Sequence, residues 1–327
     1  QVLHDPDLYF QDGNIALSAR SQVQNPPTHV IFRVHQSILV KHSQIFDDMF
    51  NVATATVNGP QHAGVPLVTM PDEAEGLREL LMFLYDPEYF STVLNASDFA
   101  LRLLVPCELA RKYFIDWIRT KAAERLLRSW PDTLGDWRRL DGEETRLVLQ
   151  RAAARADQPL GFQLREFPEP VSSILLAREC NVTIILPVAF LYLLHRSVEP
   201  DPNDLYAAAE QRIELELLPV IDGLRLFQAR QRMGTWFARY PKKSSPSLST
   251  SKISACDGTQ ACKTTVAEVW LRLSELLADG CCNMLTYSLG EDMKDICPGC
   301  KTKLAKEVSL FQSRFFDNVP RFFGFQE

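Results

Sequence analysis

The chain has no run of about 18 apolar residues, the length that a membrane-spanning helix needs. Its longest apolar stretch, residues 182–194, contains Pro187 and is typical of a buried helix in a globular protein. The first residues show no basic region followed by an apolar stretch, which a secretory signal requires. We therefore expect an intracellular protein, in the cytoplasm, the nucleus or both, with no membrane partner.

Familiar catalytic motifs are missing as well. Only 14 of the 327 residues are glycine, and no two of them are separated by a single residue, which excludes a Gly-x-Gly phosphate loop. There is no Gly-x-Ser-x-Gly nucleophile elbow and no His-Glu-x-x-His metal motif. The sequence therefore predicts a protein that is not an enzyme and has no catalytic residues.

The chain also has no net positive charge. The chain has 35 Lys and Arg against 41 Asp and Glu, a net charge of -6, which argues against a protein dominated by nucleic-acid binding. Its hydrophobic content of 46% and charged content of 23% are ordinary for a globular protein. A chain of 327 residues is long enough for roughly two domains.

The N-terminal pattern is that of a mixed α/β segment. A turn signal at residues 12–14 separates the strand-like runs 8–11 and 15–20 and predicts a β-hairpin. Residues 30–35 alternate between apolar and polar side chains as a third strand would. Residues 65–70 have the composition of another strand.

Helical spacing begins after residue 35, and we expect Ser43 to cap a second helix and so to divide residues 36–50. A further helix should open at Pro71, where acidic residues occupy its first turn, and should end before Pro87. Beyond residue 95, helices are expected within 96–128 (two of them) and at 143–155, 170–181, 184–196, 204–217, 223–239 and 266–277.

Several segments in this order carry a family likeness. They are residues 12–15 (Asp-Gly-Asn-Ile), 32–39 (Phe-Arg-Val-His-Gln-Ser-Ile-Leu), 41–50 (Lys-His-Ser-Gln-Ile-Phe-Asp-Asp-Met-Phe), 65–68, 71–72 and 80–85. In them a strand delivers Val-His into a short helix, and a Ser-capped second helix follows. Residues 1–125 thus resemble the BTB/POZ domain, which pairs proteins with one another.

The rest of the chain is similar to the long BTB proteins of mushroom-type fungi. The similar segments are residues 177–182, 186–190, 223–226 and 315–325. The expected fold class is an α+β BTB/POZ domain followed by a mostly α-helical region and a small Cys-containing C-terminal tail. We place the BTB/POZ domain at 1–125, the helical region at 126–241, a flexible linker at 242–255 and the Cys-containing tail at 256–327.

The resemblance implies a non-enzymatic interaction module, a scaffold or adaptor that associates with itself or with another BTB domain. BTB domains commonly dimerise through their first helix and an exchanged N-terminal strand. The alternative for each candidate interface residue is that it fills the domain's own core. The candidate interface residues are Leu8, Tyr9, Phe10, Ile38 and Leu39.

Two other functions remain as alternatives. The first is a cullin-dependent ubiquitin ligase adaptor, but the loop 51–64 has no acidic residue of the kind that cullin-binding relatives tend to carry. The second is a BTB-type transcriptional or chromatin regulator that contacts nucleic acid through residues 225–252, although a solvated helix face followed by a linker explains the same charges. This segment contains Arg225, Arg230, Arg232, Arg239, Lys242, Lys243 and Lys252 beside Trp236, Phe237 and Tyr240.

Cysteines are concentrated in the tail, where six of the eight lie between residues 256 and 300. In a reducing compartment such clustering favours metal over disulfides. Cys256, Cys262, Cys297 and Cys300 are the candidate ligands of a structural zinc, and Cys281 or Cys282 could replace one of them. Ordinary buried thiols, or a redox pair at Cys297 and Cys300, are the alternatives.

Overall fold

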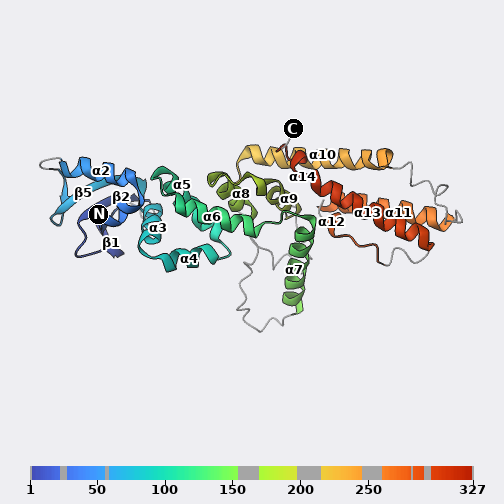
Figure 1. The fold of residues 1–327 in the computed structure, drawn as a ribbon, viewed down its shortest axis with the longest axis horizontal. Helices are drawn as coiled ribbons and strands as arrows, with labels where there is room; N and C mark the ends of the chain where they lie inside the picture. The colour runs from blue at the N-terminus through green and yellow to red at the C-terminus, as the bar shows by residue number, and fades with distance from the viewer. Residues whose placement is uncertain are drawn as a thin grey trace. The chain divides into compact units, whose positions relative to one another are not determined.

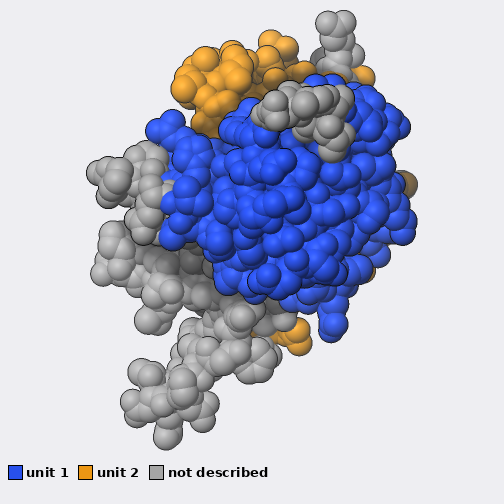
Figure 2. Space-filling view, turned by 90° about the vertical axis from the view of Figure 1, so that its left-hand side faces the viewer, with its two compact units in different colours: residues 1–128, 175–182 blue, residues 129–174, 183–327 orange. Residues whose placement is uncertain are grey.

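The structure is a computed structural model that describes residues 2–22, 28–55, 59–153, 169–196, 215–244, 260–280, 283–290 and 296–325. The chain divides into two compact units, coloured separately in Figure 2. Unit 1 comprises Gln1–Arg128 and Leu175–Val182, and unit 2 comprises Ser129–Ile174 and Thr183–Glu327. The expected α+β start followed by helices is confirmed. Among the described helices, none has the length and apolar character needed to span a membrane.

Unit 1 contains a mixed five-stranded sheet in the order β1-β3-β2-β5-β4. Strands β1, β2 and β5 are labelled in Figure 1. Strand β2 pairs antiparallel with β3 and parallel with β5, while β1 pairs parallel with β3. Ile15 and Leu17 on β2 are fully buried, so the central strand supplies the middle of the core. The strands are β1 (Val2–Tyr9), β2 (Ile15–Ser21), β3 (Thr28–Val34), β4 (Gln61–His62) and β5 (Val65–Glu73).

The predicted hairpin between residues 8–11 and 15–20 is wrong, because β3 lies between β1 and β2. The turn instead crosses the end of β3: the Phe10 N–H donates to the Arg33 carbonyl (2.8 Å) and the Asn14 N–H to the Val34 carbonyl (3.0 Å). Gly13 permits this close crossing. A Cβ at that position would lie 2.9 Å from the carbonyl carbon and oxygen of Arg33. The sequence correctly predicted a turn at residues 12–14, but not that the two strands it connects are separated by β3.

The sheet curls so that side chains of its two edge strands meet. The Tyr9 hydroxyl on β1 lies 3.1 Å from Nε2 of His62 on β4. The His4 ring stacks on Tyr9 with ring centres 4.1 Å apart and meets His62 edge-on at 5.2 Å. These three rings join the first and last strands of the sheet order.

The helices of unit 1 follow the predicted order, with two differences. Ser43 divides α1 from α2 as predicted, because its Oγ accepts a hydrogen bond from the Phe46 N–H (3.2 Å). The predicted helix start at Pro71 is wrong: β5 continues to Glu73, which pairs with Arg20 on β2. Helix α4 was not predicted. The helices are α1 (Gln36–His42), α2 (Gln44–Ala55), α3 (Ala74–Tyr85), α4 (Pro87–Asn95), α5 (Phe99–Lys112) and α6 (Asp116–Ser129).

Helix α5 ends in a left-handed turn whose key position holds Phe114 instead of glycine. The Ile115 N–H donates to the Ala110 carbonyl (2.7 Å), and Phe114 has φ +55°. A side chain in this region costs about 1–2 kcal/mol, and the Phe114 ring is 65% exposed and so gains little from packing.

We expect Phe114→Gly to stabilise the protein by about 0.5–1 kcal/mol, since the relief of the left-handed strain exceeds the added chain entropy of glycine. Phe114→Ala is the matched control, because it removes the ring but keeps the strain. Calorimetric unfolding of the full chain measures both variants. A gain with alanine as large as that with glycine would contradict this explanation.

Unit 2 is helical in its described residues. Helix α7 begins before the predicted residue 143, and α10 continues into the predicted linker as far as Ser244. Of the predicted helix 204–217, only residues 215–217 are described, as a 3₁₀ turn; residues 245–255 lie outside the described chain. The elements are α7 (Leu134–Ala153), α8 (Pro170–Glu179, ending in unit 1), the 3₁₀ turns η1 (Thr183–Ile185) and η3 (Leu215–Leu217), α9 (Leu186–Arg196), α10 (Val220–Ser244), α11 (Gln260–Gly280), α12 (Asn283–Thr286), α13 (Pro298–Asp317) and α14 (Val319–Phe322).

An aromatic cluster joins α10, α11 and α13 within unit 2. Phe311 on α13 is fully buried at its centre. Its ring centre lies 5.6 Å from Trp236, 5.0 Å from Tyr240 and 5.4 Å from Trp270. The aromatic C-terminal sequence is therefore part of the core that positions the features of this unit.

Candidate functional site

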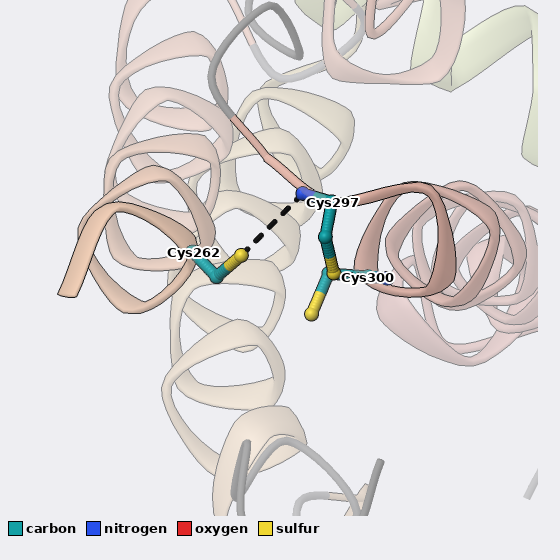
Figure 3. Close-up of side chains that lie close together, drawn as sticks. All are labelled: Cys262, Cys297 and Cys300. Atoms are coloured by element: carbon teal, nitrogen blue, oxygen red, sulfur yellow. Dashed lines mark hydrogen bonds between the residues drawn. The ribbon is translucent and has the colours of Figure 1, made fainter. Parts of the chain in front are cut away.

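Three cysteines of unit 2 lie close together and could bind a metal ion. The sulfur atoms of Cys262, Cys297 and Cys300 are all within 4.8 Å of one another (Figure 3). Cys262 lies on the first turn of α11, and Cys297 and Cys300 lie at the start of α13. Thirty-four residues of sequence separate Cys262 from Cys297, so the packing of two helices creates this group.

Backbone N–H groups already point at the sulfur atoms. The Cys297 N–H donates to Sγ of Cys262 (3.5 Å), and the Cys300 N–H donates to Sγ of Cys297 (3.5 Å). Cys297 is the N-cap of α13, and Pro298 occupies the first helical position, where its missing N–H costs nothing. The N-terminal end of a helix favours negative charge, so this position suits a thiolate, the form in which cysteine binds metal.

The geometry of the cluster fits a soft metal such as zinc. Zinc–sulfur bonds of about 2.3 Å in a tetrahedron place sulfur atoms about 3.8 Å apart, so small side-chain rotations would bring the three thiols into range. Cys262 and Cys300 are buried, with 1% and 2% of their surfaces exposed. None of the five described cysteines forms a disulfide.

The structure thus brings together three of the four predicted ligands. Cys256 lies outside the described residues, as do Cys281 and Cys282. Pro298 and Gly299, which separate Cys297 from Cys300, are the first two residues of α13.

Of the predicted interface residues, Leu8 and Leu39 are buried in unit 1, with exposures of 1% and 0%. Leu8 is fixed further by Asp5, whose carboxylate accepts the Leu8 N–H (2.9 Å) and forms an ion pair with Arg78 (3.0 Å). As described, β1 is therefore anchored in its own unit. The alternative of core packing applies to these two leucines.

The other three predicted interface residues are half-buried. Tyr9 contacts His62, as described above, and Phe10 stacks on Tyr85 with ring centres 5.0 Å apart. Ile38 lies on α1, one position before the buried Leu39. Tyr9, Phe10 and Ile38 therefore keep part of their surface available to a partner.

Part of the basic segment on α10 is used inside unit 2. Trp236, Phe237 and Tyr240 have ring centres within 5.0–5.6 Å of Phe311. Tyr240 is buried, and Trp236 and Phe237 are half-buried. Three arginines cap helix ends by donating to backbone carbonyls. These bonds join Arg225 to Phe323 (2.6 Å), Arg230 to Ala278 (2.7 Å) and Arg232 to Phe322 (2.9 Å).

Sequence reasoning missed a second cysteine pair, in unit 1. The side chains of Cys107 on α5 and Cys180 after α8 share a hydrogen bond. This bond lowers the pKa of the Cys180 thiol, burial opposes the shift, and the Arg119 charge adds to it. The pKa of Cys107 is raised by the same bond and by burial. Their separation by 72 intervening residues gave no signal of this contact.

No protein-family model matches this chain, and no curated protein or solved structure matches it either.

Proposed function

We propose that this protein is a non-enzymatic interaction module and that unit 1 pairs with a second copy of itself in the manner of a BTB domain. The observation that supports the proposal is the order of elements in unit 1. Strand β3 runs directly into α1, Ser43 caps α2, and β5 returns beside β2. This is the order of the segments that resemble BTB/POZ domains.

The pairing surface in this proposal consists of Tyr9, Phe10 and Ile38. Leu8 and Leu39, which precede or follow these residues in the sequence, are buried in the core. Half-exposed apolar and aromatic side chains on ordered elements are typical of interface centres, since little conformational entropy is lost when they are covered.

We expect the full chain to elute as a homodimer of twice its mass of 37.2 kDa, measured by size-exclusion chromatography with light scattering. Ile38→Asp should weaken self-association at least about tenfold, because it places a charge in an apolar contact. Circular dichroism checks that the variant is still folded.

Leu127→Asp is the matched control, since Leu127 is 49% exposed on α6 and lies outside the proposed surface. It should leave the dimer intact. A wild-type chain that stays at 37.2 kDa at every concentration would overturn the homodimer proposal. Equal weakening by Ile38→Asp and Leu127→Asp would move the interface elsewhere.

We also propose that Cys262, Cys297 and Cys300 hold a structural zinc, with a fourth ligand outside the described residues. The supporting observations are the sulfur separations within 4.8 Å and the N–H groups donated to two of the sulfurs. Such an ion would tie the start of α11 to the start of α13. A closed four-ligand shell has a structural role because it leaves no position for substrate.

A further inference from the structure

A pocket of about 650 Å³ lies within unit 2, lined by residues of α10, α13 and α14. Its volume is in the range of sites that hold small organic ligands. The lining side chains that matter for binding are four arginines and two aromatic residues. They are Arg232, Arg239, Arg314, Arg321, Trp236 and Tyr240.

The charge in this pocket has one sign. No Asp or Glu is among the residues that line it. Within the described part of the chain, neither Arg239 nor Arg321 has a hydrogen-bond or ion-pair partner for its guanidinium group. Arg314 lies over the Tyr240 ring, 6.0 Å from its centre, and Arg232 holds the Phe322 carbonyl. Four guanidinium groups around one space repel one another, and a multiply charged anion would relieve this repulsion.

The aromatic residues that line the pocket are held in place by packing. The Trp236 ring centre lies 5.0 Å from that of Tyr240 and 5.9 Å from that of Phe322, so packing sets the orientation of the Trp236 ring. Tyr240 is only 7% exposed, and its hydroxyl has no hydrogen-bond partner among the described residues. A buried hydroxyl without a partner is uncommon, because it has lost its water without replacement. Tyr240 contributes to the pocket lining beside Trp236.

We propose that this pocket binds a small organic polyphosphate, with its phosphate groups on the arginines and its ring against Trp236. Arginine pairs with phosphate through two parallel N–H groups, and stacking on a tryptophan suits a flat heterocycle. A nucleoside triphosphate combines both parts at a size that the pocket can hold. This proposal is independent of pairing by unit 1 and of zinc in the tail.

Isothermal titration of the full chain with three probes tests the proposal: ATP, inorganic tripolyphosphate and adenosine, each without added magnesium. We expect ATP to bind at one site per chain, tripolyphosphate to bind at least about fivefold more weakly, and adenosine weaker still, because stacking and charge both contribute. Raising the salt concentration should weaken ATP binding, since the contacts are ionic.

Arg239→Gln and Arg321→Gln should each lower ATP affinity about tenfold or more, because each removes a charge-assisted contact. Arg272→Gln is the control, as Arg272 is an exposed arginine of the same unit that pairs with Glu275 on α11. No ATP binding, or equal affinity in all three variants, would overturn the proposal. A single-stranded oligonucleotide that binds more than about tenfold tighter than ATP would also overturn it, in favour of a nucleic-acid surface.

Discussion

Phe311→Ala should destabilise unit 2 by about 3–5 kcal/mol, the range for removing a buried phenylalanine from a packed core. Phe311 is fully buried, and its ring contacts aromatic side chains from three sequence segments that are far apart. These partners belong to α10, α11 and α13, so the cavity would open where the three helices meet. The surrounding aromatic rings cannot fill this cavity without leaving their preferred rotamers. The loss of stability should therefore lie near the upper end of that range.

Chemical unfolding of the full chain, followed by circular dichroism and tryptophan fluorescence, measures this loss. Leu310→Ala is the control on the same helix, since Leu310 is 39% exposed and its truncation should cost about 0.5 kcal/mol or less. A cost for Phe311→Ala no larger than that of Leu310→Ala would show that the aromatic cluster does not hold unit 2 together.

Local signals in the sequence predicted local structure well. Ser43 was predicted to cap a helix, and its hydroxyl does accept the Phe46 N–H. The end of α3 at Tyr85 was predicted because Pro87 disfavours helical geometry at the residue before it. Both features depend only on neighbours a few residues away. Helix α4 has such a cap too, since Asp86 accepts the N–H groups of Glu88 and Tyr89, but Asp86 was interpreted only as the end of the preceding helix.

Strand pairing could not be predicted in the same way. The turn at residues 12–14 is consistent with two arrangements: a hairpin, or a connection that passes over the end of a third strand. In both, the chain reverses direction at a glycine. What decides between them is that β3 pairs with β1 on one side and β2 on the other. That choice depends on the burial of Leu8 and on the Asp5–Arg78 ion pair, which joins positions 73 residues apart.

The candidate sites show the same division. The short gap between Cys297 and Cys300 identified two of the cysteines in the cluster from the sequence alone. Cys297 is the N-cap of α13 and Cys300 lies in its first turn, so the start of one helix holds both. The arginine pocket could be predicted only in part, because Arg232 and Arg239 on α10 are far in sequence from Arg314 and Arg321. A basic run on α10 was visible, but its linear pattern could not separate the arginines that cap helix ends from those that face the pocket.

Removing the proposed zinc should have the largest effect on unit 2, because metal binding to a structural thiolate site contributes roughly 10–16 kcal/mol in small zinc-dependent domains. We expect one zinc per chain by elemental analysis of protein purified under reducing conditions. A chelator should then lower the midpoint of thermal unfolding. Cys300→Ser should abolish zinc binding, since its sulfur is buried within the cluster and serine is a poor ligand for zinc.

Cys180→Ser is the control for this experiment, because Cys180 pairs with Cys107 in unit 1 and should leave the zinc content unchanged. Two further variants then identify the fourth ligand: Cys256→Ser, and the double change of Cys281 and Cys282 to serine. The variant that loses the metal contains the ligand. A chain without zinc whose Cys297 and Cys300 resist alkylation until they are reduced would indicate a disulfide and a redox pair. A zinc-free chain with both thiols reactive and with no response to the chelator would leave them as ordinary packed cysteines. Because the three sulfurs are already within 4.8 Å, zinc needs little rearrangement to bind. Metal content therefore separates a zinc site from the two zinc-free outcomes, and alkylation separates those two from each other.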